Sequence, residues 1–122
     1  MHDSKMSTLL AQQKQVKTHR SQVVFVGQNT EMNCLLSRGL NVSSWVYKAI
    51  GKTQVFTLYT VEMGLDRDVE RFQVSDKADI LRIIHTQLED AGMYSCKALY
   101  SEVAGRQILE EVMDLVVLGE FS

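Results

Sequence analysis

Proline is absent from this chain of 122 residues, which contains only two cysteines and one tryptophan. Long apolar runs are absent too, since stretches such as residues 115–118 fall far short of the roughly 18 apolar residues that a membrane-spanning helix needs. Neither sign of charge dominates, because 13 lysines and arginines stand against 15 aspartates and glutamates, for a net charge of −2. We therefore expect no direct membrane insertion by this stretch and no binding of nucleic acid.

The size and composition favour one globular domain. Domains cluster at roughly 100–150 residues, and a chain of this length can bury a single core. With 45% hydrophobic and 23% charged residues, the composition is ordinary for a globular protein. Global disorder and a fibrous repeat are therefore excluded.

The two ends differ from the middle of the chain. Residues 1–20 carry four basic side chains against one aspartate, and their apolar cluster at residues 9–11 is shorter than the roughly 7–15 residues of a signal-peptide core. A weak amphipathic helix over residues 5–19 is one interpretation, but Gln13 interrupts its apolar stripe. We expect a flexible N-terminal arm or cloning-derived segment at 1–20, the domain at 21–118, and a tail, native or cloning-derived, at 119–122.

From residue 22 onward the sequence divides into short apolar stretches separated by polar or glycine-bearing turns. Several of them alternate apolar and polar residues with the period of two that a half-buried strand requires. A series of short strands about ten residues apart is typical of an antiparallel sandwich or barrel. The expected strands lie near residues 22–26, 31–36, 44–48, 54–60, 80–84 and 93–99.

One segment follows a different pattern. In residues 106–118 apolar side chains recur at helical spacing, with Glu110, Glu111 and Asp114 between them. Taken alone, this stretch indicates a helix. We nevertheless expect a strand there, because of the residues that precede it.

Three residues and one short run carry the argument about the fold. Cys34 is followed by Trp45 eleven residues later, and Cys96 ends a run of the form Asp-x-Gly-x-Tyr-x-Cys at residues 90–96. Over roughly residues 22–118 this combination resembles the immunoglobulin superfamily, in particular the V-set of antigen-receptor-like and immune-type receptor variable domains. The resemblance implies an all-β fold, a two-sheet antiparallel immunoglobulin-like sandwich with V-type Greek-key topology.

The resemblance also implies a disulfide between Cys34 and Cys96 that joins the two sheets, with Trp45 against the sulfurs. A bridge that spans 62 residues is worth about 4 kcal/mol in the chain-entropy account. That spacing leaves room for the two extra edge strands of a variable-type domain. The alternative is a pair of buried free thiols, as in intracellular immunoglobulin modules.

Further core residues follow from the same resemblance. Tyr94 would bond nearby backbone as a tyrosine corner, and Gly92 would let the chain turn tightly into its strand. In V-set relatives an arginine at the position of Arg71 pairs with an aspartate at the position of Asp90. Breaking such a half-buried pair would strand a charge.

Three features depart from the family pattern. The aromatic-Gly-x-Gly bulge of antigen receptors is missing, with only residues 105–107 nearby, so antibody-style pairing of two domains is not expected. Thr86 stands where relatives bury an aliphatic residue. Because the chain has no proline to block its edge strands, self-association by strand pairing, as in a homodimer, is an open alternative.

The sequence contains no complete motif for catalysis, metal binding or nucleotide binding. Residues 51–53 imitate the end of a phosphate loop, but the first glycine of that loop would fall at Val46. Residues 66–68 lack the ligand spacing of a calcium loop, and two cysteines with three scattered histidines make no readable zinc site. We expect no enzyme, cofactor or metal ion.

Function in this fold lies in its surfaces. With Trp45 and Cys96 pointing inward, the period of two sends their neighbours to the outer face of one sheet, where V-set receptors commonly bind partners. Residues 99–106 correspond to the third hypervariable loop, and tyrosine and arginine are common at binding hot spots. The candidate partner-binding residues are Val46, Lys48, Tyr59, Lys97, Leu99, Tyr100, Glu102 and Arg106.

Asn41 begins the sequence Asn-Val-Ser, a candidate glycosylation site that mildly favours an extracellular context. The resemblance then implies a non-catalytic recognition domain of a cell-surface or secreted protein. It would bind a protein partner, or itself, in adhesion or immune recognition. Two alternatives remain open: an intracellular structural module of a filament-associated protein, and a carbohydrate-binding variable domain.

Overall fold

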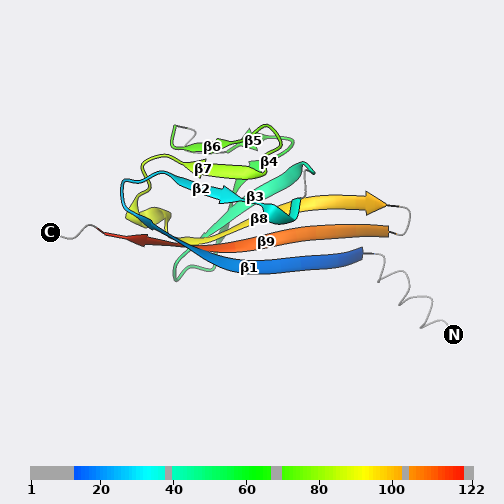
Figure 1. The fold of residues 1–122 in the computed structure, drawn as a ribbon, viewed down its shortest axis with the longest axis horizontal. Helices are drawn as coiled ribbons and strands as arrows, with labels where there is room; N and C mark the ends of the chain where they lie inside the picture. Colours follow the sequence, from blue (N-terminus) through cyan, green and yellow to red (C-terminus); the bar gives the residue numbers. More distant parts are fainter. Residues whose placement is uncertain (1–12, 38–39, 67–69, 103–104, 120–122) are drawn as a thin grey trace.

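A computed structural model describes residues 13–37, 40–66, 70–102 and 105–119, in which the strands form two sheets (Figure 1). Two short 3-10 turns, η1 at Leu35–Ser37 and η2 at Leu88–Asp90, lie between strands. The larger sheet has the strand order β1 (Gln13–Phe25), β9 (Gly105–Leu118), β8 (Gly92–Glu102), β3 (Val42–Ala49), β4 (Val55–Thr60) and β5 (Gly64–Leu65), and the smaller sheet has the order β2 (Thr30–Asn33), β7 (Ile80–Ile83) and β6 (Phe72–Val74).

The core lies between the two sheets and follows from the alternation along their strands. Met32, Leu81 and Ile83 of the smaller sheet are fully buried. They form one cluster with Trp45 and Met113 of the larger sheet. Residues at odd and even positions of each strand therefore divide between this core and the solvent, as expected for a sandwich.

Residues 106–118 form most of strand β9, so the expectation of a strand is confirmed there. Leu109, Met113 and Leu115 are buried on the core side, which is the alternation of a strand. The helical spacing arose because Glu111, also at a core-facing position, is polar and hides that alternation. Glu111 is only 3% exposed, and its charge is paired with Arg20 of β1.

Strand β1 corrects the expected domain boundary. Residues 13–20, which the sequence indicated as part of an arm, belong to this strand, so the boundary at residue 21 falls inside it. β1 pairs with β9 in parallel from Gln13 opposite Arg106 to Phe25 opposite Leu118, without a register shift. Pairing with a strand about ninety residues away is a tertiary contact that local composition does not reveal.

The β8–β9 hairpin also differs from expectation. Residues 99–106 were expected to form a hypervariable-type loop, but β8 continues to Glu102 and β9 begins at Gly105. The two strands pair without a register shift, since the glycine bulge of antigen receptors is absent. As a result, β8, β9 and β1 extend together beyond the smaller sheet (Figure 1).

Candidate functional site

Cys34, directly after β2 of the smaller sheet, and Cys96, on β8 of the larger sheet, form a disulfide with 6.1 Å between their Cα atoms. Trp45 is the strand neighbour of Cys96 in the β3–β8 register and has no exposed surface. Its indole Nε1 donates a hydrogen bond of 2.6 Å to the carbonyl of Ala78. The polar atom of the ring is thus satisfied inside the core, which makes its full burial favourable.

Tyr94 has the geometry of a tyrosine corner. Its hydroxyl donates to the carbonyl oxygen of Asp90 at 2.6 Å, four residues upstream. Burial, and then the negative charge of Asp90, raise the pKa of Tyr94 far above its usual value. The ring of Tyr47 lies 4.8 Å from that of Tyr94, and the pKa of Tyr47 is raised as well, chiefly by burial.

An ion pair closes the end of the sandwich beside Tyr94. Arg71 donates two hydrogen bonds, of 2.8 and 2.9 Å, to the two carboxylate oxygens of Asp90. The Asp90 carboxylate also accepts a hydrogen bond of 2.7 Å from the backbone N–H of Gln87. The Arg71 guanidinium lies 5.4 Å from the centre of the Phe72 ring. The positive charge of Arg71 is therefore stabilised both by the Asp90 carboxylate and by the face of the Phe72 ring.

Glycine is required at position 92 because the backbone of β3 passes very close to it. A Cβ at this position would lie 2.5 Å from the backbone carbonyl oxygen of Lys48. Its φ angle of +151° is also one that residues with side chains rarely adopt. Any side chain at Gly92 would therefore force β8 away from β3.

Thr86, which departs from the aliphatic residue of relatives, has a polar partner inside the protein. Its hydroxyl lies 2.7 Å from the hydroxyl of Thr30, and both residues are buried. Each hydroxyl satisfies the other, so the threonine does not leave an unpaired polar group in the core.

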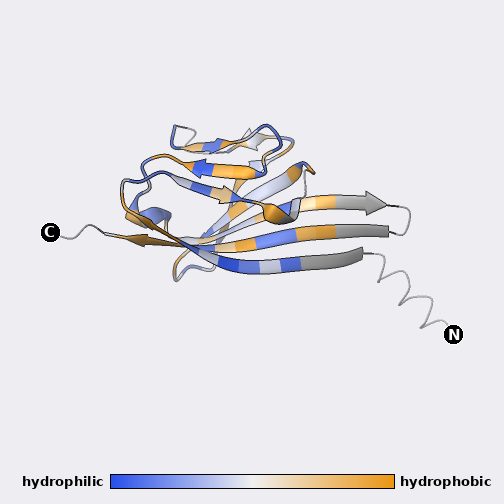
Figure 2. Cartoon of the chain, viewed as in Figure 1, coloured by the Kyte–Doolittle hydropathy of each residue, from blue (hydrophilic) through white to orange (hydrophobic). Residues whose placement is uncertain are grey.

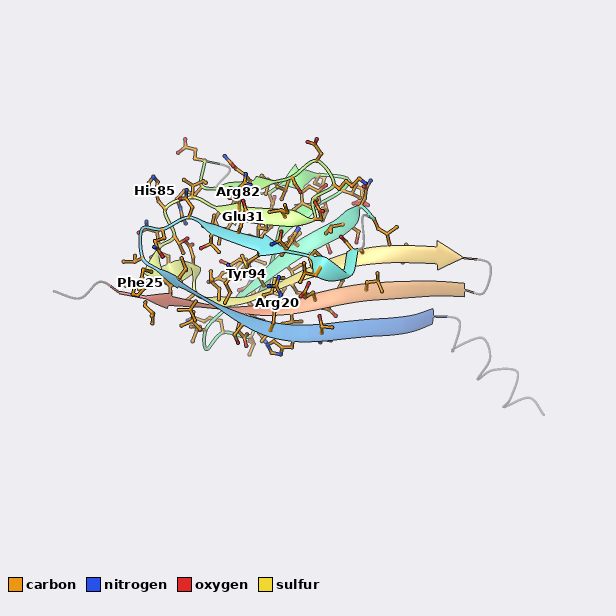
Figure 3. All side chains as sticks on the ribbon, in the orientation of Figure 1. Arg20, Phe25, Glu31, Arg82, His85 and Tyr94 are labelled. Carbon is orange, nitrogen blue, oxygen red and sulfur yellow. A yellow bond between two sulfur atoms is a disulfide. The ribbon has the colours of Figure 1, made fainter. Side chains whose placement is uncertain are left out.

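A second buried charge was missed at the level of sequence. Glu111, on the core side of β9, accepts a hydrogen bond of 2.7 Å from Nε of Arg20 and another of 2.7 Å from the backbone N–H of Leu35. Arg20 also donates to the carbonyl of Asn33 at the end of β2. Figure 3 labels Arg20 on β1 and Tyr94 further into the sandwich. Only the β1–β9 register would have revealed this pair.

Glu111 lies beside the disulfide, with donor atoms of Cys34, Cys96 and Glu111 all within 4.8 Å of one another. This grouping does not make a metal centre, because a metal binds a thiolate and both sulfurs are already joined in the disulfide. The positive charge of Arg20 at Glu111 also opposes a cation there.

The outer face of the larger sheet carries part of the expected partner-binding set. Val46, Lys48, Lys97 and Leu99 lie on the face opposite Trp45 and Cys96, and Leu99 is 45% exposed. Tyr59 does not belong to this face. A register shift between Trp45 and Val46 brings Tyr59 opposite Trp45, so that Tyr59 packs against the core.

The side chains of Tyr100, Glu102 and Arg106 lie outside the described residues, although their backbones belong to the β8–β9 ladder. Asn41 is exposed just before β3. The hydroxyl of Ser43, the third residue of its sequon, donates a hydrogen bond of 3.0 Å to the carbonyl of Lys97.

Charged side chains cross the middle of the outer face. Glu110 on β9 lies 4.0 Å from the ammonium group of Lys17 on β1, and accepts a 2.6 Å hydrogen bond from Ser95 on β8. Farther along, His19 is 2.8 Å from Asp114. These contacts join β1, β9 and β8 on the solvent side.

A hollow of about 440 Å³ lies beside this band, where the β3–β4 turn meets β8 and β9. Ile50, Met93 and Val116 contribute to its apolar lining. Its polar side is formed by Lys48, Lys52 and Asp114, and Asp114 is already paired with His19. Ile50 is 71% exposed and Val116 is 41% exposed. Figure 2 shows the apolar character of this end of β9. Neither lysine forms an ion pair with a residue that the structure describes.

The disulfide, the buried tryptophan and the tyrosine corner define an immunoglobulin-like sandwich. The model of the immunoglobulin V-set domain matches residues 17–118, so the chain belongs to the immunoglobulin V-set family. The match begins four residues before the boundary expected from the sequence, within β1.

Solved structures share the fold. The second Ig domain from mouse polymeric immunoglobulin receptor superposes with a TM-score of 0.57 and 16% sequence identity, covering 84% of this chain and 99% of that chain. At this identity the likeness concerns the fold alone. A search of curated proteins found no match.

Family membership and the disulfide are typical of extracellular recognition modules, and V-set domains are typically non-catalytic. Among the described residues, no helix has the length and apolar character needed to cross a membrane.

Proposed function

We propose that this chain is a non-catalytic recognition domain of a cell-surface or secreted protein, and that it binds a protein partner through the outer face of its larger sheet. Membership of the V-set family and the Cys34–Cys96 disulfide support this proposal. Disulfides persist in oxidising compartments, which favours an extracellular setting over a filament-associated module inside the cell.

The observation that carries the proposal is the hollow at the β3–β4 turn. An exposed isoleucine and valine lie beside two lysines that form no ion pair within the described part of the chain. An apolar contact with a charged rim is the composition of a protein-binding patch. The partner surface that fits it is apolar with acidic residues at its edge. Leu99, farther along the same face, extends the contact.

The test uses fluorescent tetramers of the whole chain on a panel of cultured cells. The double variant Ile50→Asp/Val116→Asp places acids in the hollow, and Val61→Asp/Met63→Asp is its matched control, at the opposite end of β4. We expect the first variant to lose tenfold or more of the binding and the control to keep it, with equal melting temperatures. Equal loss in both variants, or no binding to any cell, would contradict the proposal.

The intracellular alternative is tested by thiol titration of natively expressed protein. We expect no titratable thiol before reduction, since both cysteines are bonded. Two titratable thiols would favour the filament-associated module.

The carbohydrate-binding alternative has less support. Sugar rings usually stack on exposed aromatic side chains, and the one tryptophan of the chain is fully buried, while the exposed Phe25 lies at the end of β1, outside the hollow. We expect a glycan array to give no hits while the tetramers bind cells. Strong, selective hits on the array would reverse this preference.

We also propose that Asn41 carries an N-linked glycan when the protein passes through a eukaryotic secretory pathway. Its exposure just before β3 supports this assignment. Mass spectrometry of the secreted chain before and after enzymatic deglycosylation tests it, with Ser43→Ala as the control. An unmodified Asn41 would remove this support for an extracellular setting.

A further inference from the structure

The four edges of the two sheets are unequal. The larger sheet ends at β1, with 13 residues, and at β5, with two. The smaller sheet ends at β2, with four residues, and at β6, with three. Short edge strands offer few backbone groups for pairing, whereas β1 extends for about 40 Å at the rise of a strand. Of the described strands, β1 is thus the one long edge.

Two of the usual means of blocking an edge, proline and a bulge, are missing from β1, which carries only charged side chains against unwanted pairing. The chain contains no proline, and the β1–β9 ladder has no bulge. At the edge of β2, in contrast, two backbone carbonyl groups already accept hydrogen bonds from side chains of β1. Arg20 donates to the carbonyl of Asn33, and Gln22 donates to that of Glu31.

The hydrogen bonds at the end of β1 identify which groups face its free edge. The N–H of Val26 donates to the carbonyl of Leu118 at 2.8 Å, whereas the N–H of Phe25 turns away to the side chain of Gln28. Because successive residues of a strand direct their backbone groups to opposite sides, even-numbered residues face β9. The odd-numbered residues from 17 to 23 therefore direct N–H and C=O groups to the free edge.

The charge of β1 has one sign. Lys14, Lys17 and Arg20 lie on the strand together with His19, and no aspartate or glutamate does. The strand that β1 already pairs with, β9, carries three acidic residues. Arg20 is bound to Glu111 and His19 to Asp114, whereas Lys17 forms only a long contact of 4.0 Å with Glu110. Because the side chain of Lys17 is 60% exposed, its charge can also be reached by a strand on the other side. Two copies of β1 side by side would instead bring like charges together.

We propose that the free edge of β1 binds an extended acidic segment of another protein by strand addition. Backbone groups of the odd-numbered residues supply the ladder, and the exposed side chains of Lys17 and His19, at alternate positions of β1, favour glutamate and aspartate in the added strand. The occupant resembles β9 in chemistry, since both present acids to the same basic strand. This site is separate from the hollow on the outer face and does not depend on the function proposed for it.

The test uses a ten-residue synthetic peptide in which valine alternates with glutamate, titrated into the whole chain and followed by fluorescence anisotropy. A peptide with lysine in place of glutamate is the control. We expect the acidic peptide to bind at least tenfold more tightly, with a preference that weakens as salt is added. Equal binding of both peptides, or no binding at millimolar concentration, would overturn the proposal.

Amide hydrogen exchange on the unmodified chain locates the peptide. We expect slower exchange at the odd-numbered residues 17–23 in the complex and no change at the hollow around Ile50. Protection that appears only at the hollow would assign the peptide to the outer face and reject the edge. Concentration-dependent dimers with the same protection pattern would identify a second copy as the occupant and reject the acidic partner.

The variant Ser21→Pro removes one outward N–H at a position where proline is tolerated on an edge strand. We expect it to weaken peptide binding tenfold or more, while Ser21→Ala binds like the unmodified chain. Equal affinity of the two variants would overturn the proposal. If Ser21→Pro fails to fold, the exchange pattern of the unmodified chain decides the question.

Discussion

Among the residues that the structure describes, two arginine side chains pair with buried carboxylates, one at the end closed by Tyr94 and one where β1 passes the end of β2. Arg71 and Asp90 are 19 residues apart and share two hydrogen bonds. Arg20 and Glu111 are 91 residues apart and share one, of 2.7 Å. The carboxylates are similarly buried, with 6% and 4% of the side chains exposed.

The difference lies in what each pair organises. Asp90 fixes a local turn, because it accepts from Arg71 and from the backbone of Gln87 just before η2. Glu111 joins three distant segments, since it binds Arg20 of β1 and the backbone of Leu35 while it sits on β9. The first pair completes a motif of the family, and the second ties the long edge strand to the core.

The largest expected effect is at Asp90. Asp90→Ala removes both hydrogen bonds to Arg71 and the one from Gln87, and takes the Asp90 charge away from a partly buried guanidinium. We expect the free energy of unfolding in urea to fall by about 3–4 kcal/mol. A loss below about 1 kcal/mol would show that this end of the sandwich does not depend on the pair.

Glu111→Ala should cost less, about 2–3 kcal/mol in the same measurement. Arg20 remains a third exposed and keeps its bond to the carbonyl of Asn33, so the stranded cation is better solvated than Arg71. Exchange of β1 amides should accelerate in this variant and not in Asp90→Ala. If amide hydrogen exchange along β1 is unchanged in Glu111→Ala, the Arg20–Glu111 pair does not tie β1 to the core.

Alkaline pH should weaken the Asp90 end selectively. Burial raises the pKa of Tyr94 above its unfolded value, so the unfolded chain loses that proton first and the stabilisation is lost as pH rises above about 10. We expect a decline of up to about 1.4 kcal/mol per pH unit. The slope should shrink in Tyr94→Phe, and the same slope in both proteins would contradict this assignment.

The smallest effect is expected at an exposed pair that serves as the control. Glu31 and Arg82 join β2 to β7 on the solvent side of the smaller sheet, with 50% and 43% of their side chains exposed (Figure 3). Glu31→Ala should cost less than about 1 kcal/mol in urea unfolding, and less again in salt. A cost equal to that of Glu111→Ala would mean that burial does not explain the difference.

The structure agrees with the sequence where a motif is short or a period is regular. The resemblance to V-set domains that Cys34, Trp45 and Cys96 carry predicted the fold and the disulfide, and both are confirmed. Predictions for the surface fared less well. Tyr59 packs against the core because the register of β3 and β4 shifts between Trp45 and Val46. The local sequence gives no sign of this shift. The expected loop at residues 99–106 is largely strand, because the hairpin ladder continues past Leu99.

The sequence by itself determined the class of this protein, because the two cysteines, the tryptophan, the run that ends at Cys96 and the alternation of strands are recognisable from residue types and their spacing along the chain. Tertiary structure alone decided that β1 begins at Gln13, that Arg20 neutralises Glu111, and that a long basic edge is left open. The reason is physical: a strand's partner and register depend on segments far along the chain, and a charge becomes tolerable in a core only once that partner stands beside it.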